Sequence, residues 1–211
     1  IPQLRAGQVL IDMSTAPVGL TRRLAEEAAA RGASYADAPV ARTRAAAEAG
    51  TLAIMVGAAA DVFARIEPIL AHAGEAILHC GDVGCGQVAK ILNNMVLFQN
   101  VVAMSEALAL GTAAGMDGGR LFDIISQGSG DSFALRNHGM KAMIPDTFPK
   151  QAFPTDYALK DVSYALELAR DAGLSAPGAE LAEARMRMAK AAGFAEEYFP
   201  VLARLAGRPT E

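Results

Sequence analysis

The chain has 211 residues, of which 52% are hydrophobic and 20% are charged, with a formal net charge of −4 and a pI near 5.4. This composition is sufficient for one large hydrophobic core or two small ones, and it excludes a chain that is disordered throughout. The acidic balance, without a stripe of basic residues, predicts no nucleic-acid partner.

The first third of the chain alternates short apolar runs with helical patterns. Strands are predicted at residues 8–12, 35–40, 52–56 and 76–79, and helices at residues 21–31 and 60–71. Ser14 and Thr15 precede Pro17, which suits a first helical turn, so both are candidate helix N-caps. Strands that alternate with helices predict an α/β sheet.

The pattern changes after residue 86. One long helix is predicted at residues 88–115, and its second half is apolar nearly all round, which predicts burial on every side. Further helices are predicted at residues 120–126, 135–144, 157–172, 178–192 and 198–205, with no strand after residue 83. The predicted architecture is therefore part of an α/β domain (residues 1–83) followed by an all-helical domain (residues 84–211) that includes the long interdomain helix.

The sequence predicts neither a membrane span nor a metal site. The longest apolar stretch, residues 95–111, is interrupted by polar residues and is interpreted as a buried helix. Cys80 and Cys85 lack partners at metal-ligand spacing and are too few for a disulfide framework. A reducing, cytoplasmic location is the expectation.

A glycine-rich turn precedes the long helix. Gly84-Cys-Gly-Gln-Val-Ala89 matches the dinucleotide fingerprint G-x-G-x-x-A, but the acidic residue expected about 20 positions later falls inside the helix. We therefore interpret the glycines as allowing a helix N-terminus to approach a small anionic ligand.

Lys90 and Asn94 follow this turn, four residues apart on one helix face, with Gln87 and Asn93 beside them. Such a pair is often only a solvated surface. The glycine-rich turn before it and the apolar helix after it favour a second interpretation, in which Lys90 lies at the edge of a cleft. A partly desolvated lysine can exchange a proton near neutral pH.

Four motifs in order resemble those of the β-hydroxyacid dehydrogenases, the family of 3-hydroxyisobutyrate dehydrogenase and tartronate semialdehyde reductase. Gly84-x-Gly86-x-x-x-Lys90-x-x-Asn93-Asn94 resembles the catalytic motif. Residues 12–15 resemble the segment beside the nicotinamide, residues 37–40 with 50–52 the substrate loop, and residues 157–162 a late cofactor-contacting motif. The resemblance covers nearly the whole chain. It implies a partial Rossmann-type sheet followed by a helical domain like the C-terminal part of 6-phosphogluconate dehydrogenase.

The resemblance also implies a chemistry and a set of roles. The cofactor would be NAD or NADP, and the substrate a small anionic semialdehyde or 3-hydroxy acid of the hydroxyisobutyrate, tartronate, succinic-semialdehyde or sulfolactaldehyde kind. Lys90 would be the general acid for reduction and the base for oxidation, and Asn94 would orient it. The remaining contacts implied are substrate contacts at Gly86 and Asn93, and cofactor contacts at Ser14, Thr15 and Lys160. Asp161 would hold local structure. The alternatives are a helix cap at Thr15 and an exposed helical lysine at Lys160.

The chain departs from the family at two places. Ala41-Arg42-Thr43 stands where the family has Ser-Gly-Gly, so Arg42 offers a planar fork for a carboxylate or sulfonate and Thr43 a hydroxyl, unless Arg42 and Arg44 only decorate a loop. The family also opens with a strand, a Gly-x-Gly-x-x-Gly turn and an acidic residue that are not found here. Roughly 80 or 90 further residues are expected upstream, judged by the size of a mononucleotide-binding half.

Other functions remain open. The chain could be a non-catalytic fragment whose long apolar helices dimerise, and a homodimer or homotetramer is expected in either case. A third interpretation keeps the fold but makes the substrate an imine, against which the family resemblance of Lys90 and Asn94 argues. Ser129, Ser132 and His138 lie near each other in sequence, but no Gly-x-Ser-x-Gly elbow accompanies them, which disfavours a serine hydrolase.

Overall fold

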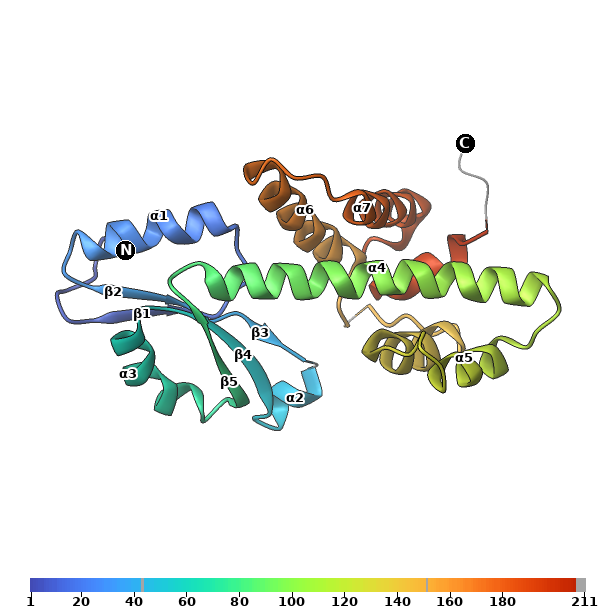
Figure 1. Cartoon of the computed structure of the whole chain (residues 1–211), viewed down its shortest axis with the longest axis horizontal. Coiled ribbons are helices and arrows are strands. Elements are labelled where there is room, and N and C mark those ends of the chain that lie inside the picture. Colours follow the sequence, from blue (N-terminus) through green and yellow to red (C-terminus); the bar gives the residue numbers. More distant parts are fainter. Residues whose placement is uncertain (43, 151, 208–211) are drawn as a thin grey trace. The chain divides into compact units, whose positions relative to one another are not determined.

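The computed structural model describes residues 1–42, 44–150 and 152–207, and it consists of two compact units, Ile1–Asn93 and Asn94–Glu211 (Figure 1). The boundary between them lies inside one continuous helix, α4 (Cys85–Ala113). The predicted boundary after residue 83 marks the turn that leads into this helix. The first two turns of α4 therefore pack with the sheet, and the rest of α4 packs with the helical unit.

The first unit is built on a five-stranded mixed sheet. Its strands are β1 (Val9–Asp12), β2 (Ser34–Asp37), β3 (Val40–Ala41), β4 (Leu52–Gly57) and β5 (Gly74–Gly81). β1 pairs with β2 and β4 pairs with β5 in parallel, whereas β4 runs antiparallel to β2 and β3. The strand predicted at residues 35–40 is wrong in its second half, because the chain leaves β2 at Asp37 and Val40 begins a separate strand. Pro39 lies at the break, where it has no N–H to donate to a ladder.

Two helices cover opposite faces of this sheet (Figure 1). Leu10 and Tyr35 pack in one cluster with Ala28 of α1 (Val18–Ala29). Their neighbours in the strands, such as Ile11 and Ala36, pack in a second cluster with residues of α3 (Ala60–Leu70). This alternation follows from the two-residue period of a strand, which sends successive side chains to opposite faces. A short helix, α2 (Arg44–Glu48), follows β3.

The second unit is helical. It contains the rest of α4, then α5 (Gly118–Ser126), the π-helix η1 (Leu135–Met143), α6 (Thr155–Asp171), α7 (Pro177–Ala189), the π-helix η2 (Lys190–Phe194) and the 3-10 helix η3 (Phe199–Leu205). Phe98, Phe122, Met186 and Phe199 are fully buried in its core. Within residues 94–150 and 152–207 the only β pairing is an isolated bridge between Pro154 and Tyr198, in agreement with the helical domain that the sequence predicts.

The prediction that the second half of α4 is buried on every side is wrong. Val101 and Val102 lie in the core, but Ala103 is exposed and Leu110 is 71% exposed, in line with Val96 earlier in the helix, which is 53% exposed. The spacing of seven residues puts these three on one line along the helix, opposite the core face.

By length and composition alone α4 could also cross a membrane, which is weak evidence because core helices pass the same test. Apolar composition cannot distinguish a helix surrounded by its own chain from one with an uncovered face. The expected homodimer or homotetramer stays a prediction.

Candidate active site

The loop between β1 and α1 carries two of the predicted cofactor-binding residues, Ser14 and Thr15. α1 begins at Val18, with Pro17 in the N-cap position. The role of Thr15, as a cofactor contact or as a helix cap, remains a prediction. Ser14 instead closes a local turn: its N–H and its hydroxyl both donate to Oδ1 of Asp12, at 2.9 and 2.7 Å. The other carboxylate oxygen of Asp12 accepts from the Tyr35 hydroxyl at 2.8 Å. Asp12 therefore ties the start of the loop to β2.

Gln87 holds the same loop from the other side. Its side chain is fully buried, its Nε2 donates to the Ser14 carbonyl at 2.8 Å, and its Oε1 accepts from the Ala16 N–H at 3.1 Å. One amide from the first turn of α4 thus fixes the backbone on both sides of Thr15. The sequence indicates only a polar residue near Lys90 at this position and gives no sign of a contact that spans 71 residues.

The N-terminus of α4 is occupied by the protein's own carboxylate. Asp37, at the end of β2, is fully buried, and its two oxygens accept from the backbone N–H groups of Gly84 and Gln87, each at 2.7 Å. Burial raises the pKa of Asp37 above its usual value, and these two hydrogen bonds oppose that rise. The interpretation that the helix N-terminus accepts an anionic ligand is therefore wrong, because Asp37 already supplies the negative charge.

Gly86 packs against the sheet. A Cβ at this position would lie 2.4 Å from the Met55 carbonyl oxygen and 2.8 Å from Oδ2 of Asp37. The glycine is needed because the helix approaches the backbone of β4 so closely. Gly86 is buried, so what the structure assigns to it is a packing role, and its predicted substrate contact remains a prediction.

The predicted substrate contacts Ala41 and Arg42 directly follow residues 37–40 of the predicted substrate loop, and Ala41 lies in β3. Arg42 has a positive φ of 83°, and its Nη1 donates to the Thr51 carbonyl at 2.6 Å and to the Glu75 carboxylate at 2.8 Å. The guanidinium that we expect to bind an anion is thus paired inside the first unit. Thr43 lies outside the described residues, and the side chain of Arg44 is likewise not described.

α4 itself presents the predicted catalytic pair. Lys90 and Asn94 are one turn apart on this continuous helix, Lys90 half-buried and Asn94 only 2% exposed, while Asn93 is exposed. Within the second unit, Nδ2 of Asn94 donates to Oδ2 of Asp161 at 2.8 Å. The Nζ of Lys160 lies 3.1 Å from the other oxygen of Asp161. The bond between Asn94 and Asp161 is a contact that the sequence does not predict.

Lys160 agrees in part with the alternative that the sequence leaves open. Its side chain is 45% exposed, as an ordinary surface lysine would be, but its Nζ is paired with Asp161 and lies 5.3 Å from the centre of the Tyr164 ring. Its predicted contact with a cofactor remains a prediction.

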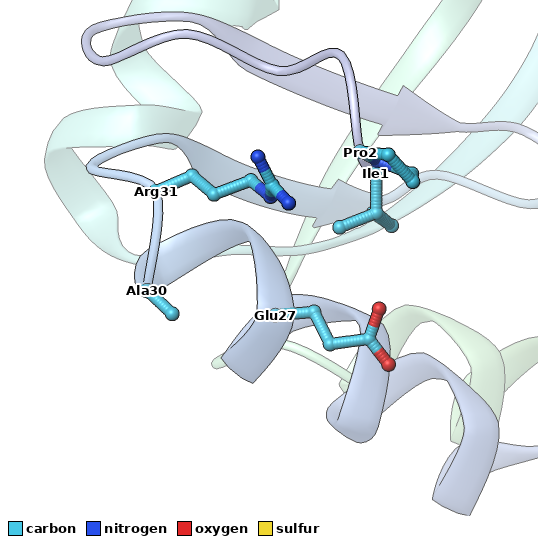
Figure 2. Close-up of a pocket in the computed structure, with 5 residues that line it drawn as sticks. All are labelled: Ile1, Pro2, Glu27, Ala30 and Arg31. Atoms are coloured by element: carbon cyan, nitrogen blue, oxygen red, sulfur yellow. The ribbon is translucent and has the colours of Figure 1, made fainter.

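A shallow hollow of about 430 Å³ lies elsewhere in the first unit. Figure 2 shows its lining, which comprises Ile1, Pro2, Glu27, Ala30 and Arg31, at the end of α1 and the start of the chain. None of these is a predicted site residue. No cluster of three or more metal-binding side chains occurs in the part of the chain that the structure describes.

Comparison with known proteins agrees with the two-part architecture. A family model described as the NAD-binding domain of 6-phosphogluconate dehydrogenase matches residues 1–81. Another, described as NAD-binding of NADP-dependent 3-hydroxyisobutyrate dehydrogenase, matches residues 84–205.

Several relatives match almost all of the chain. The 2-(hydroxymethyl)glutarate dehydrogenase of Eubacterium barkeri is 37% identical over 92% of this chain and 64% of its own length. The NAD-dependent L-serine dehydrogenase of Pseudomonas aeruginosa is 31% identical over 97% of this chain and 70% of its own length. The structure of Mycobacterium tuberculosis 3-hydroxyisobutyrate dehydrogenase with L-serine superposes with a TM-score of 0.88 at 31% identity, covering 95% of this chain and 70% of that one. The chain thus spans about two thirds of the length of these relatives.

Proposed function

Because the chain belongs to the β-hydroxyacid dehydrogenase family, we propose that it interconverts a small 3-hydroxy acid and the corresponding semialdehyde with NAD or NADP. The observation that carries the proposal is the pair on α4, a half-buried Lys90 one turn before a buried Asn94. An amine in this setting can move a proton to or from a substrate oxygen. The family motif gives these two residues the same role.

The residues present fit only part of a dinucleotide. The Gly84–Ala89 turn does not suit a pyrophosphate, because the buried carboxylate of Asp37 takes up the N–H groups of Gly84 and Gln87. The loop at the carboxyl end of β1 is a better candidate, since ligands of open α/β sheets bind at that edge. There Gln87 holds the backbone around Thr15, and Ser14 is exposed beside it. We assign this loop to the nicotinamide end of the cofactor.

The cofactor, when bound, supplies or accepts the hydride. The chain's own residues then transfer the proton and position the reacting groups. Lys90 gives a proton to the carbonyl oxygen in reduction and takes it from the hydroxyl in oxidation, while Asn94 orients the reacting groups. Lys160, on α6, is proposed as a further cofactor contact.

The substrate is proposed to be a small carboxylate. The relatives are named for 2-(hydroxymethyl)glutarate, 3-hydroxyisobutyrate and L-serine, which share a carboxylate and a hydroxyl on a short carbon chain. Arg42 and Thr43 are proposed to contact the anionic group, together with the loop residue Ala41. For Arg42 this requires exchanging the Glu75 carboxylate for that of the substrate.

The proposal is tested with Lys90→Ala, with Lys150→Ala as the matched control because Lys150 is an exposed lysine whose partner is Glu196. Turnover of 3-hydroxyisobutyrate, L-serine and 2-(hydroxymethyl)glutarate is followed by the absorbance of the reduced nicotinamide. We expect Lys90→Ala to lower kcat by about 10²–10⁴-fold, with an unchanged melting temperature, and Lys150→Ala to match the wild type. Near-normal turnover in Lys90→Ala would refute the assignment.

Calorimetry with NADH and NADPH discriminates the alternative of a non-catalytic helical module. It is carried out on this chain and on a version that is extended upstream. Binding to the extended version favours the enzyme, whereas binding to neither favours the module.

A further inference from the structure

We propose that Asp161 is a positioning residue that fixes which end of the Asn94 amide is available to the reaction. By accepting from the amino group, Asp161 leaves the carbonyl oxygen of Asn94 as the end of the amide that can serve Lys90. Its catalytic consequence rests on the proposed function, but the orientation itself does not.

The contact is a buried one inside the second unit. Asn94 is 2% exposed and Asp161 is 4% exposed, and Nδ2 of Asn94 lies 2.8 Å from Oδ2 of Asp161. The bond connects α4 to α6, whose other buried residues are the small or aliphatic Ala158, Val162 and Ala165 together with Thr155. Asp161 is therefore the only ionisable residue among those that α6 buries.

An ionised carboxylate has no donor, so only the amino end of an amide can face it at this distance. The two ends of an asparagine amide are nearly indistinguishable by shape, and their assignment depends on such a partner. Because Oδ1 and Nδ2 diverge from the same carbon, the carbonyl oxygen of Asn94 points away from Asp161. What Asn94 offers on that side is a hydrogen-bond acceptor.

Keeping a carboxylate at this buried position would be costly without its partners. Asn94 donates to one oxygen. The other oxygen, Oδ1, is buried without a hydrogen bond from the described residues, and only the charge of the Lys160 ammonium, 3.1 Å away, offsets its burial. An aliphatic residue would fill the same place without this cost. The arrangement is therefore better explained by the orientation that Asp161 imposes than by packing alone.

An acceptor at Asn94 has a defined use. Lys90 lies one turn earlier on α4, and side chains at this spacing are neighbours on a helix. An ammonium only donates, so an amide oxygen stabilises the protonated form of Lys90, whereas an amino group would oppose it. Asp161 thus acts on Lys90 through Asn94, and favours the form that gives a proton to a carbonyl oxygen.

The test replaces the acceptor without changing the shape. Asp161→Asn leaves an amide that can donate or accept, so Asn94 is no longer fixed. Asp156→Asn is the matched control, because Asp156 lies on the same helix but is exposed and pairs with Lys190. Two signals are read by NMR in the intact chain: the side-chain amide protons of Asn94, and the titration of Lys90 through its labelled ε-carbon.

In Asp161→Asn we expect the Asn94 amide signals to move. We also expect the Lys90 titration midpoint to fall by about half a pH unit. This is less than the roughly 1–3 units that a charge in direct contact gives, because Asp161 acts on Lys90 only through Asn94. Asp156→Asn should leave both signals as in the wild type. If Asp161 is merely structural, Asp161→Asn will lower the melting temperature while the Lys90 midpoint stays at its wild-type value, and the proposal is then overturned.

A second variant covers the case in which Asp161→Asn does not fold. The double exchange Asn94→Asp with Asp161→Asn keeps one carboxylate and one amide in the pair, with the carboxylate now on α4. The Lys90 midpoint should then be at or above the wild-type value, and a midpoint below it would also overturn the proposal.

Activity is the third measurement. Asp161→Asn should lower kcat about tenfold and leave KM within about twofold of the wild type. In metal sites, losing a residue that orients a ligand side chain lowers activity by about 10–100-fold, and we expect the low end of that range here. A wild-type chain without turnover would refute the proposed function and leave the two NMR outcomes to decide the role of Asp161.

Discussion

Replacing Gly86 with alanine probes how closely the first turn of α4 must lie against the sheet. The added Cβ would be 2.4 Å from the Met55 carbonyl oxygen, 2.8 Å from the Gly57 backbone nitrogen and 2.8 Å from Oδ2 of Asp37. Two of these are backbone atoms, which cannot rotate away as the end of a flexible side chain would. The start of the helix must therefore move away from β4.

The cost has two parts. Inserting a methyl group into a closely packed region costs about 1–3 kcal/mol. Moving the helix also lengthens the 2.7 Å bonds from Gly84 and Gln87 to Asp37, and hydrogen bonds to charged groups contribute about 1.5–3 kcal/mol each. Because these bonds lengthen rather than break, we count about 2 kcal/mol for the two together. The free energy of unfolding should then fall by about 3–5 kcal/mol, a large part of the 5–15 kcal/mol typical of a domain.

The assay is urea unfolding at neutral pH, read by circular dichroism and compared at equal m-values. Gly19→Ala is the control, because a Cβ at this position in α1 meets nothing within 4 Å. It should change stability by no more than about 0.5–1 kcal/mol, in the stabilising direction. A loss below about 1 kcal/mol in Gly86→Ala would show that the contact with β4 yields easily, and the reasoning would be wrong.

Two further predictions concern charged groups. Burial, with a smaller effect of Lys141, lowers the pKa of His138 from 6.5 to about 4. As the pH falls from about 6.5 toward 4 the unfolded chain takes up a proton that the folded chain does not, so stability should fall by up to about 3 kcal/mol. Urea unfolding between pH 7 and 4 measures how the free energy of unfolding depends on pH. The part due to His138 should disappear in His138→Phe and persist in His72→Gln, the control at an exposed histidine. An unchanged pH dependence in His138→Phe would contradict this assignment. Glu75→Ala should cost less than about 1 kcal/mol, since the Arg42–Glu75 pair is exposed. It should also lower KM for a carboxylate substrate, because it removes the carboxylate that competes for Arg42. KM values that respond to neither Glu75→Ala nor Arg42→Ala would exclude Arg42 from substrate binding.

The sequence predicts well what depends on local pattern. The apolar runs give the strands at 8–12, 52–56 and 76–79 within a few residues of β1, β4 and β5, and the long 3.6-residue pattern gives α4. Because Lys90 and Asn94 belong to that helix, their common face follows from spacing alone. The family resemblance adds the chemistry, which periodicity does not contain.

What the sequence does not predict are contacts between distant residues. Asp37 and the N–H of Gly84 are 47 residues apart, and Asn94 and Asp161 are 67 apart. An aspartate inside a predicted strand gives no indication that its carboxylate will cap a helix elsewhere in the chain. For the same reason the sequence suggests a ligand at the α4 N-terminus, although Asp37 provides the anion there. The sequence also does not predict the exposed line on α4, because hydrophobicity describes a residue and not the neighbours that cover it.

The amide of Gln87 has a consequence for motion. Most residues of a connecting loop exchange their backbone protons with water much faster than a core helix does. Here the Ala16 N–H donates to a fully buried side chain that belongs to α4, so its exchange requires the Gln87 amide to leave its buried position. The Ala16 N–H should therefore exchange more slowly than the N–H groups of an ordinary surface turn.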